Sequence, residues 1–227
     1  NIECYNFTRT KWTLLLFIVL YRCGIFTKTD RNIGIDLGIC DFAIFSDGTK
    51  IENPRFYEKS EKKLALLQRS LSRKTKGSSN WDKARIKVAN LQKHISNQRK
   101  DFLQKLTTNI VKNYDVICIE DLDVKSLKES DNTQTNKHVS DVSWSEFGRM
   151  LTYKTQWYGK ELSVIDRFYP SSQTCHICGH ISGKKSTDIR QWICPNCQSE
   201  LDRDINAAIN ILNEGLRIRT VGTTGIA

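Results

Sequence analysis

Two CxxC pairs near the C-terminus constrain this chain more than any other feature. Cys175 and Cys178 form the first pair, Cys194 and Cys197 form the second, and fifteen residues separate the two pairs. Each pair supplies two thiolates from one tight turn, and two such turns complete a tetrahedral sulfur shell. Because four thiolates leave no open coordination position, the spacing predicts a structural Zn²⁺ site in a zinc ribbon over residues 171–200.

The charge of the chain is concentrated in one segment. The 227 residues carry a net charge of +10, and the composition is that of a soluble globular protein with one substantial domain and a small inserted one. Residues 55–105 hold fifteen Lys/Arg and four Asp/Glu, a net charge of +11, so the rest of the chain is nearly neutral. Such a basic stripe indicates a polyanionic partner, most often nucleic acid, although a solvated helix face has the same composition.

The other cysteines and the apolar N-terminal run indicate in which cellular compartment the protein resides. Cys4, Cys23, Cys40 and Cys118 have no regular spacing, which argues against a disulfide framework and favours a reducing, cytoplasmic location. The apolar run at residues 14–21 is shorter than the ~20 residues that a membrane-spanning helix needs. We interpret this run as a buried strand and expect no membrane association.

Periodicity gives the expected order of elements. Asp47-Gly48 is a hairpin signal within three antiparallel strands between residues 33 and 53. Apolar residues spaced by three, four or seven then predict a basic helical hairpin over 55–113. The later elements are a strand at 115–120, a mobile loop at 129–136, a helix at 143–158 with Trp144, Phe147, Leu151 and Trp157 inward, a strand at 162–168 and a helix at 204–212 capped by Gly215. This is the element order of an RNase H-like α/β domain with an inserted zinc ribbon.

Three acids occupy comparable places in that order. Asp36 lies in the first strand, Glu120 ends the fourth, and Asp204 opens the last helix. Carboxylates that meet at one sheet edge repel each other, and a divalent cation relieves that repulsion. Hard oxygen ligands favour Mg²⁺ or Mn²⁺, which can support phosphodiester hydrolysis. Each acid also has another interpretation. Asp36 could cap a turn at the end of its strand, and Asp204 could be a favourable helix N-terminal charge. Glu120 competes for its assigned role with its neighbours Asp121 and Asp123.

Longer motifs give the chain a family resemblance. They are GIDLGI (34–39), Arg99 to Phe102, ICIEDL (117–122), the stretch from Trp144 through YKTQWYGKEL (153–162), YPSSQTCHICGH (169–180), WICPNC (192–197), LDRDINAAINIL (201–212) and VGTTGIA (221–227). With these motifs the chain from residue 32 onward resembles the OrfB/TnpB family of insertion-sequence proteins, whose core is a RuvC-like nuclease of the RNase H fold.

The resemblance implies a site and a chemistry. The three acidic motifs of the family fall on Asp36, Glu120 and Asp204, where Mg²⁺ or Mn²⁺ would bind, and its zinc ligands fall on the four cysteines of the CxxC pairs. Such proteins are RNA-guided DNA endonucleases, so DNA and a guide RNA are the expected partners. Backbone contacts are expected from the basic hairpin, at Arg69, Arg73, Lys74, Lys76, Lys83, Arg85, Lys87 and Arg99.

The resemblance also sets out the domains and the competing functions. We expect a remnant of the family's N-terminal region at 1–31, a RuvC-like domain at 32–170 plus 201–218, the zinc ribbon at 171–200 and a tail at 219–227. The favoured function is a metal-dependent DNA endonuclease core. A nucleic-acid-binding remnant without catalysis and a strand-transfer transposase are the alternatives, and the sequence leaves the oligomeric state open.

Overall fold

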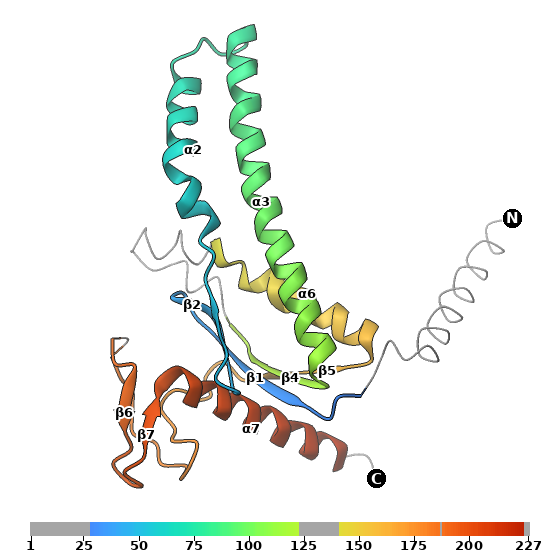
Figure 1. Ribbon diagram of the computed structural model, residues 1–227, viewed down its shortest axis with the longest axis vertical. Helices are drawn as coiled ribbons and strands as arrows, with labels where there is room; N and C mark the ends of the chain where they lie inside the picture. Colours follow the sequence, from blue (N-terminus) through green and yellow to red (C-terminus); the bar gives the residue numbers. More distant parts are fainter. Residues whose placement is uncertain (1–27, 123–140, 187, 225–227) are drawn as a thin grey trace, which may run out of the picture.

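The core of the protein is a mixed five-stranded sheet. A computed structural model describes residues 28–122, 141–186 and 188–224. The sheet order is β3-β2-β1-β4-β5 (Figure 1). Its strands are β1 (Asn32–Leu37), β2 (Asp41–Phe45), β3 (Lys50–Glu52), β4 (Val116–Glu120) and β5 (Glu161–Ile165). β1, β2 and β3 form an antiparallel meander, whereas β4 runs parallel to β1 and β5 parallel to β4, as the RNase H-like prediction requires.

Helices cover both faces of this sheet, giving three layers (Figure 1). Helix α7 (Arg203–Thr224) packs on one face, and α3 (Ser79–Asn113) and α6 (Trp144–Tyr158) pack on the other. Side chains of β4 alternate between the layers, as a strand buried on both faces must. Cys118 joins Ile211 of α7 in one buried cluster, whereas Ile117 joins Ile110 of α3 in the other.

Two glycines bring α7 close to the sheet. A Cβ atom on Gly34 of β1 would lie 2.1 Å from the backbone oxygen of Ala208, and one on Gly215 would lie 2.4 Å from Sγ of Cys118. The predicted helix end at Gly215 is therefore wrong, because α7 continues to Thr224. Gly215 lies within α7, where its lack of a side chain lets the helix pack closely on β4, and it does not cap the helix.

The predicted basic hairpin is present and projects away from the sheet (Figure 1). Its arms are α2 (Phe56–Ser72) and α3. Ser78 caps α3, its hydroxyl accepting a 3.2 Å hydrogen bond from the Trp81 backbone N–H. Leu64 of α2 and Val88 of α3 are buried, so the hairpin has a small apolar seam while its outer faces stay charged.

Helix α6 and strand β5 differ in detail from the predictions. Trp144, Phe147 and Leu151 are buried as expected, but the side chain of Trp157 is 57% exposed. Thirteen residues separate Trp157 from Trp144, and at 3.6 residues per turn that places Trp157 about 220° around the helix. The strand predicted at 162–168 ends at Ile165, because Asp166 begins a turn by accepting the Phe168 N–H at 2.7 Å.

Some predictions concern residues outside this description. The apolar run at 14–21 and the loop at 129–136 lie outside the described residues. Within the described part of the chain, no helix is both long and apolar enough to cross a membrane.

Candidate active site and metal centre

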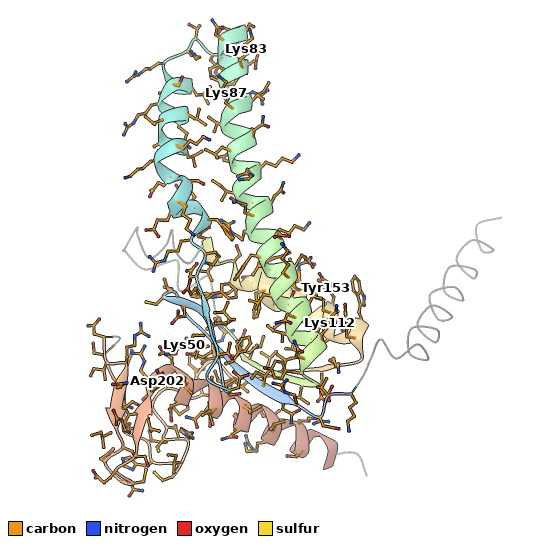
Figure 2. The ribbon with its side chains drawn as sticks, viewed as in Figure 1. Lys50, Lys83, Lys87, Lys112, Tyr153 and Asp202 are labelled. Carbon is orange, nitrogen blue, oxygen red and sulfur yellow. The ribbon has the colours of Figure 1, made fainter. Side chains whose placement is uncertain are left out.

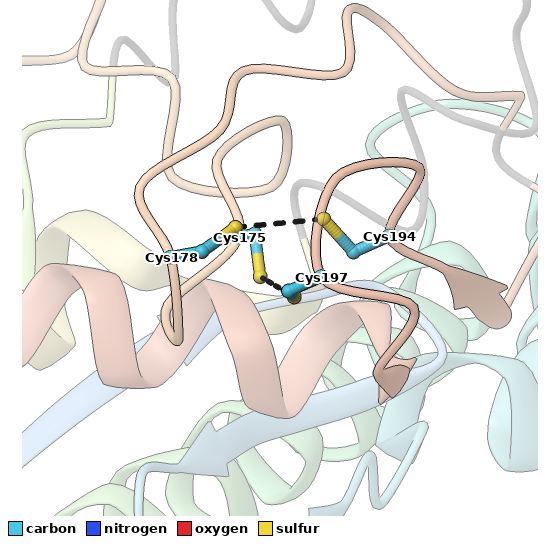
Figure 3. A group of neighbouring side chains, drawn as sticks. All are labelled: Cys175, Cys178, Cys194 and Cys197. Carbon is cyan, nitrogen blue, oxygen red and sulfur yellow. Dashed lines mark hydrogen bonds between the residues drawn. The ribbon is translucent and has the colours of Figure 1, made fainter.

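The four cysteines converge as their spacing predicts (Figure 3). Their sulfur atoms all lie within 4.8 Å of one another. The Sγ atoms of Cys175 and Cys197 are 3.7 Å apart, as are those of Cys178 and Cys194. A tetrahedral shell with Zn–S bonds of about 2.3 Å has sulfurs about 3.8 Å apart, so this group fits a four-coordinate zinc ion.

Two tight turns build this sulfur shell. In the first, the Cys175 N–H donates to the His180 carbonyl at 2.9 Å, and Gly179 adopts φ +73°. In the second, the Cys194 N–H donates to the Ser199 carbonyl at 2.9 Å. The second turn joins β6 (Gln191–Ile193) to β7 (Glu200–Asp202), and β7 leads directly into α7.

Two buried asparagines fasten the first turn to α7. The side-chain NH₂ group of Asn206 donates to the Thr174 carbonyl at 2.8 Å, and that of Asn210 donates to the same oxygen at 2.7 Å. The Asn206 side-chain oxygen accepts the backbone N–H of His176 at 2.9 Å and lies 2.9 Å from Nδ1 of its ring. The cysteine centre is therefore rigidly linked to the helix that carries Asp204.

The three predicted acids come from three elements that meet at one edge of the sheet. Asp36 lies in β1, which pairs in parallel with β4, and Glu120 is the last residue of β4. Asp204 is in the first turn of α7 and is only 7% exposed. Asp36 and Glu120 are half-buried. The sheet and its covering helix thus bring together residues from the two ends of the chain.

Electrostatics show that these acids influence one another. Burial raises the pKa of Asp36 to about 8, with further repulsion from Glu120 and Asp204. Burial also raises the pKa of Glu120 to about 7, with repulsion from Asp121 and Asp166. Carboxyls with such raised pKa values favour any cation that can replace the proton.

The oxygen donors suit a hard divalent cation, but they do not form a closed ligand shell. Among the described residues, the four cysteines are the one group of three or more potential ligands whose atoms lie so close together. The donor chemistry of Asp36, Glu120 and Asp204 fits Mg²⁺ or Mn²⁺.

Two arginines hold Asp204: Arg203, its neighbour in the chain, and Arg190, which lies just before β6. Arg190 Nη1 donates to Asp204 Oδ2 at 2.5 Å, and Arg203 Nε donates to Oδ1 at 3.1 Å. Arg190 Nη2 also lies 3.3 Å from Sγ of Cys40. The register of the β6–β7 hairpin explains why Arg190 reaches Asp204: the pairing of Gln191 with Asp202 places Arg190 opposite Arg203, the residue before Asp204.

Asp202 has a structural place beside the site. Its Oδ1 accepts the backbone N–H groups of Asp204 and Ile205, each at 3.0 Å, so it caps α7. Its Oδ2 accepts a 2.8 Å bond from Lys50 of β3; both residues are labelled in Figure 2. This capping role distinguishes Asp202 from Asp204. Asp121, the neighbour of Glu120, is engaged in an ion pair with Arg167.

The predicted nucleic-acid contacts divide into two groups. Seven of them are exposed on the hairpin: Arg69, Arg73, Lys74, Lys76, Lys83, Arg85 and Lys87, of which Lys83 and Lys87 are labelled in Figure 2. The eighth, Arg99, is half-buried and donates to Asp141 at 2.6 Å, an ion pair that ties α3 to the segment just before α6. The exposed residues stay a prediction, and Arg99 has a structural partner.

A mixed α/β sheet with a helical hairpin and a cysteine metal centre defines the class as an RNase H-fold domain with an inserted zinc-ribbon-like unit. A family model described as "Probable transposase", OrfB_IS605, matches residues 26–131. A second, the Cas12f1-like TNB domain, matches residues 144–211. With the relatives below, these matches show that the chain belongs to the OrfB/TnpB family, as its motifs predict.

Two relatives have informative names. A protein of Streptomyces pristinaespiralis named "Putative RNA-guided DNA endonuclease" is 44% identical over 86% of this chain and 48% of its own length. "Putative RNA-guided DNA endonuclease InsQ" of Escherichia coli (strain K12) is 36% identical over 84% of this chain and 50% of its own length. The chain thus spans about half the length of the curated relatives it matches.

Solved structures share the fold. "Cryo-EM structure of CRISPR-Cas12f Ternary Complex" matches with a TM-score of 0.61 at 20% identity, over 82% of this chain and 40% of that one. "Cryo-EM structure of the Cas12f1-sgRNA-target DNA complex" matches with a TM-score of 0.57 at 20% identity, over 80% and 49%. The RuvC-like architecture is therefore confirmed.

Proposed function

We propose that this chain is the catalytic part of a transposon-encoded, RNA-guided DNA endonuclease that requires a divalent metal. The observation that carries the proposal is the meeting of Asp36, Glu120 and Asp204 at one sheet edge, beside the cysteine centre. The names of the relatives support the activity, and the complexes of the structural neighbours support guide RNA and DNA as partners.

Each acid has a defined role in this proposal. Asp36, Glu120 and Asp204 would hold one or two Mg²⁺ or Mn²⁺ ions, and bound ions of this kind activate water and stabilise the leaving oxygen in phosphodiester hydrolysis. The protein places the three carboxylates on two parallel strands and one helix, so that their separation depends on the packing of α7 on the sheet. Zn²⁺ in the sulfur shell would act structurally.

The arginines at Asp204 belong to the same mechanism. Arg190 is about half exposed, whereas Arg203 is mostly buried and also donates to the Ser186 carbonyl at 3.0 Å. Arg203 therefore orients Asp204, and Arg190 can turn from Asp204 toward a phosphate when a cation takes that carboxylate. A guanidinium at this position matches the bidentate geometry of a phosphodiester.

The remaining assignments extend the proposal to the domains. Residues 32–170 plus 201–218 would form the nuclease domain, and residues 171–200 would form the zinc ribbon. The exposed basic residues of the α2–α3 hairpin and of the turn between its arms would contact the nucleic-acid backbone, because Lys and Arg charges are attracted to phosphates whatever the base sequence.

The test is cleavage of labelled single-stranded and double-stranded DNA by the purified chain in Mg²⁺ or Mn²⁺. The expected result is cleavage that disappears in Asp36→Ala and persists in Asp47→Ala, which alters an acid in the β2–β3 turn. No cleavage in either metal, with or without co-purified RNA, would contradict the proposal for this chain.

A second function has one specific observation behind it. Both Arg190 and Arg203 engage Asp204 and so occupy the carboxylate that a catalytic cation would need. A chain that keeps this arrangement would bind nucleic acid through its basic hairpin without cutting it. Salt-sensitive DNA binding together with no cleavage in either metal would favour that alternative.

A further inference from the structure

A pocket lies directly beside Glu120. It has a volume of about 290 Å³ and opens between α6 and the edge strand β5. Leu162 and Val164 of β5 form one wall, and α6 supplies Trp144 and Arg149. Its size is at the small end of the range for ligand pockets, about 300–1,000 Å³, which suits one nucleobase. The carboxylate edge therefore has an apolar recess with a guanidinium at its rim.

A ladder of three side chains on α6, exposed at its two ends and half-buried at its middle, begins at this pocket. Arg149, Tyr153 and Trp157 are four residues apart, so they lie in one row along the helix. The Arg149 guanidinium lies 5.6 Å from the Tyr153 ring centroid, and the Tyr153 and Trp157 rings are 4.7 Å apart, edge to face. The Tyr153 hydroxyl accepts a 3.1 Å bond from Gln104 of α3, which fixes the middle ring.

The two ends of the ladder are accessible to a partner, because Arg149 and Trp157 are mostly exposed. The side chain of Arg149 is 63% exposed, and Trp157 is 57% exposed. A buried Trp would be part of the core, but a Trp at this exposure on a helix face contributes little to packing. Its large ring is available for a partner with a flat face.

The charge around the ladder suits a polyanion. The Arg149 guanidinium donates to both oxygens of Glu146, at 2.7 and 2.6 Å, and lowers the pKa of that carboxyl, with a smaller contribution from Lys100 of α3. The ladder thus joins the pocket at Glu120 to the basic side of α3. A protein-docking face would be expected to be more apolar and less charged at its centre.

The pocket wall also contains a hydrogen-bond donor without an acceptor among the described residues, the Trp144 indole N–H. Trp144 lines the pocket, and its buried indole N–H has no hydrogen-bond partner among the described residues. Buried donors are nearly always satisfied in folded proteins. An oxygen-bearing ligand at this wall could supply the missing acceptor.

We propose that the pocket beside Glu120 and the Arg149–Tyr153–Trp157 ladder form a binding track for single-stranded DNA. A base would occupy the pocket next to the scissile phosphate, Arg149 would contact a phosphate, and further bases would stack on Tyr153 and Trp157. This proposal rests on the proposed nuclease function, to which it adds the path of the strand.

The test measures binding separately from cleavage. A fluorescent single-stranded oligonucleotide is titrated into the Asp36→Asn protein without Mg²⁺, so that no strand is cut. Adding Trp157→Ala should weaken binding about tenfold, because one base–aromatic stack is lost. Adding Trp157→Phe should keep most of the affinity. Adding Arg149→Gln should reduce the slope of log K against log salt by about 0.7, the value for one phosphate contact to a single strand.

Ile218→Ala is the matched control, since Ile218 is a partly exposed apolar residue on α7, across the sheet from α6. It should bind like the parent. Equal affinity in the parent, Trp157→Ala and Arg149→Gln proteins would overturn the track, and so would a parent that does not bind the oligonucleotide. DNA cleavage by the protein with Asp36 intact reports on the nuclease function independently. If the protein with Asp36 intact cleaves DNA and Trp157→Ala does not weaken oligonucleotide binding, the proposed track is wrong and the proposed nuclease function still stands.

Discussion

Arg190 of the cysteine-rich unit and Asp204 of α7 are joined by a 2.5 Å ion pair, although they lie on opposite sides of the β6–β7 hairpin. The pair connects the metal-binding unit to the carboxylate edge. It also places a positive charge where a divalent cation would bind. In the proposed function, Arg190 and a metal ion would therefore compete for the Asp204 carboxylate.

Replacing Arg190 by Gln should shift the metal dependence of cleavage. Without the competing guanidinium, the Mg²⁺ midpoint should fall roughly fivefold to tenfold, since 1.4 kcal/mol is tenfold in an equilibrium constant. The maximal rate should also fall, because a phosphate contact is lost. Mg²⁺ titrations of cleavage measure both effects. Arg217→Gln, which removes a similar pair with Glu214 further along α7, should leave the midpoint unchanged.

The raised pKa values predict how stability depends on pH in zinc-loaded protein without Mg²⁺. Asp36 and Glu120 have folded pKa values of about 8 and 7, above unfolded values of about 4. The contribution of the two protonated carboxyls to the free energy of unfolding is fully present below pH 4 and is lost as pH rises toward 8. Denaturant unfolding between pH 5 and pH 8 should show the parent losing about 3–4 kcal/mol more than Asp36→Asn, the linkage free energy for one carboxyl with these two pKa values. If the free energies of unfolding of the parent and of Asp36→Asn changed with pH in the same way, Asp36 would be an ordinary solvated acid.

Cys194→Ser should remove the structural metal. The sulfur shell needs four thiolates, and a hydroxyl does not replace a buried thiolate ligand. The purified variant should hold less than one zinc per chain and melt at a lower temperature. Cys40→Ser, which changes a thiol outside the shell, should retain full zinc. Equal zinc content in both variants would contradict the assignment.

Asn206→Ala should separate the cysteine centre from α7. It leaves the His176 N–H without its acceptor and removes one donor to Thr174, which should cost about 1–3 kcal/mol. Asn206→Asp keeps the acceptor for His176 and should lie in between. Asn113→Ala is the control, because Asn113 is a half-buried asparagine at the end of α3 whose side chain, among the described residues, bonds only to Asn109 within the same helix. Thermal unfolding and the rate of zinc release to a chelator measure the effect, and an unchanged release rate would argue against the link.

Gly215→Ala should destabilise the protein by about 1–3 kcal/mol, because the new methyl group meets Cys118 of β4. The same substitution at Gly148 of α6 meets nothing within 4 Å and should instead stabilise by about 0.5–1 kcal/mol. Opposite signs in paired denaturant titrations would confirm the packing of α7 on β4. A stabilised Gly215→Ala protein would show that the two elements are further apart.

Much of the fold follows from local patterns in the sequence. The Asp47-Gly48 turn, the helical hairpin and the cysteine shell each depend on residues close in the chain or on fixed ligand chemistry. Gly215 misled the prediction because glycine both ends helices and permits close packing, and only the position of Cys118 separates these roles. Trp157 misled it because a helical stripe drifts around the axis over thirteen residues.

The sequence singles out the three candidate acids more readily than the basic residues around them. Asp36, Glu120 and Asp204 stand in recognisable motifs, whereas Arg190 becomes visible only through the register of β6 and β7. The pocket beside Glu120 needs the packing of α6 against β5, which no local pattern specifies. Long-range packing therefore decides what surrounds the acids.

The most direct test of the account is Mn²⁺ binding, measured by electron paramagnetic resonance on zinc-loaded protein. The central claim is that Asp36, Glu120 and Asp204 hold divalent cations together. The parent should bind one or two Mn²⁺ ions, and Asp36→Asn, Glu120→Gln and Asp204→Asn should each weaken binding at least tenfold, while Asp101→Asn on the outer face of α3 should not. Equal Mn²⁺ binding in all five proteins would contradict the claim.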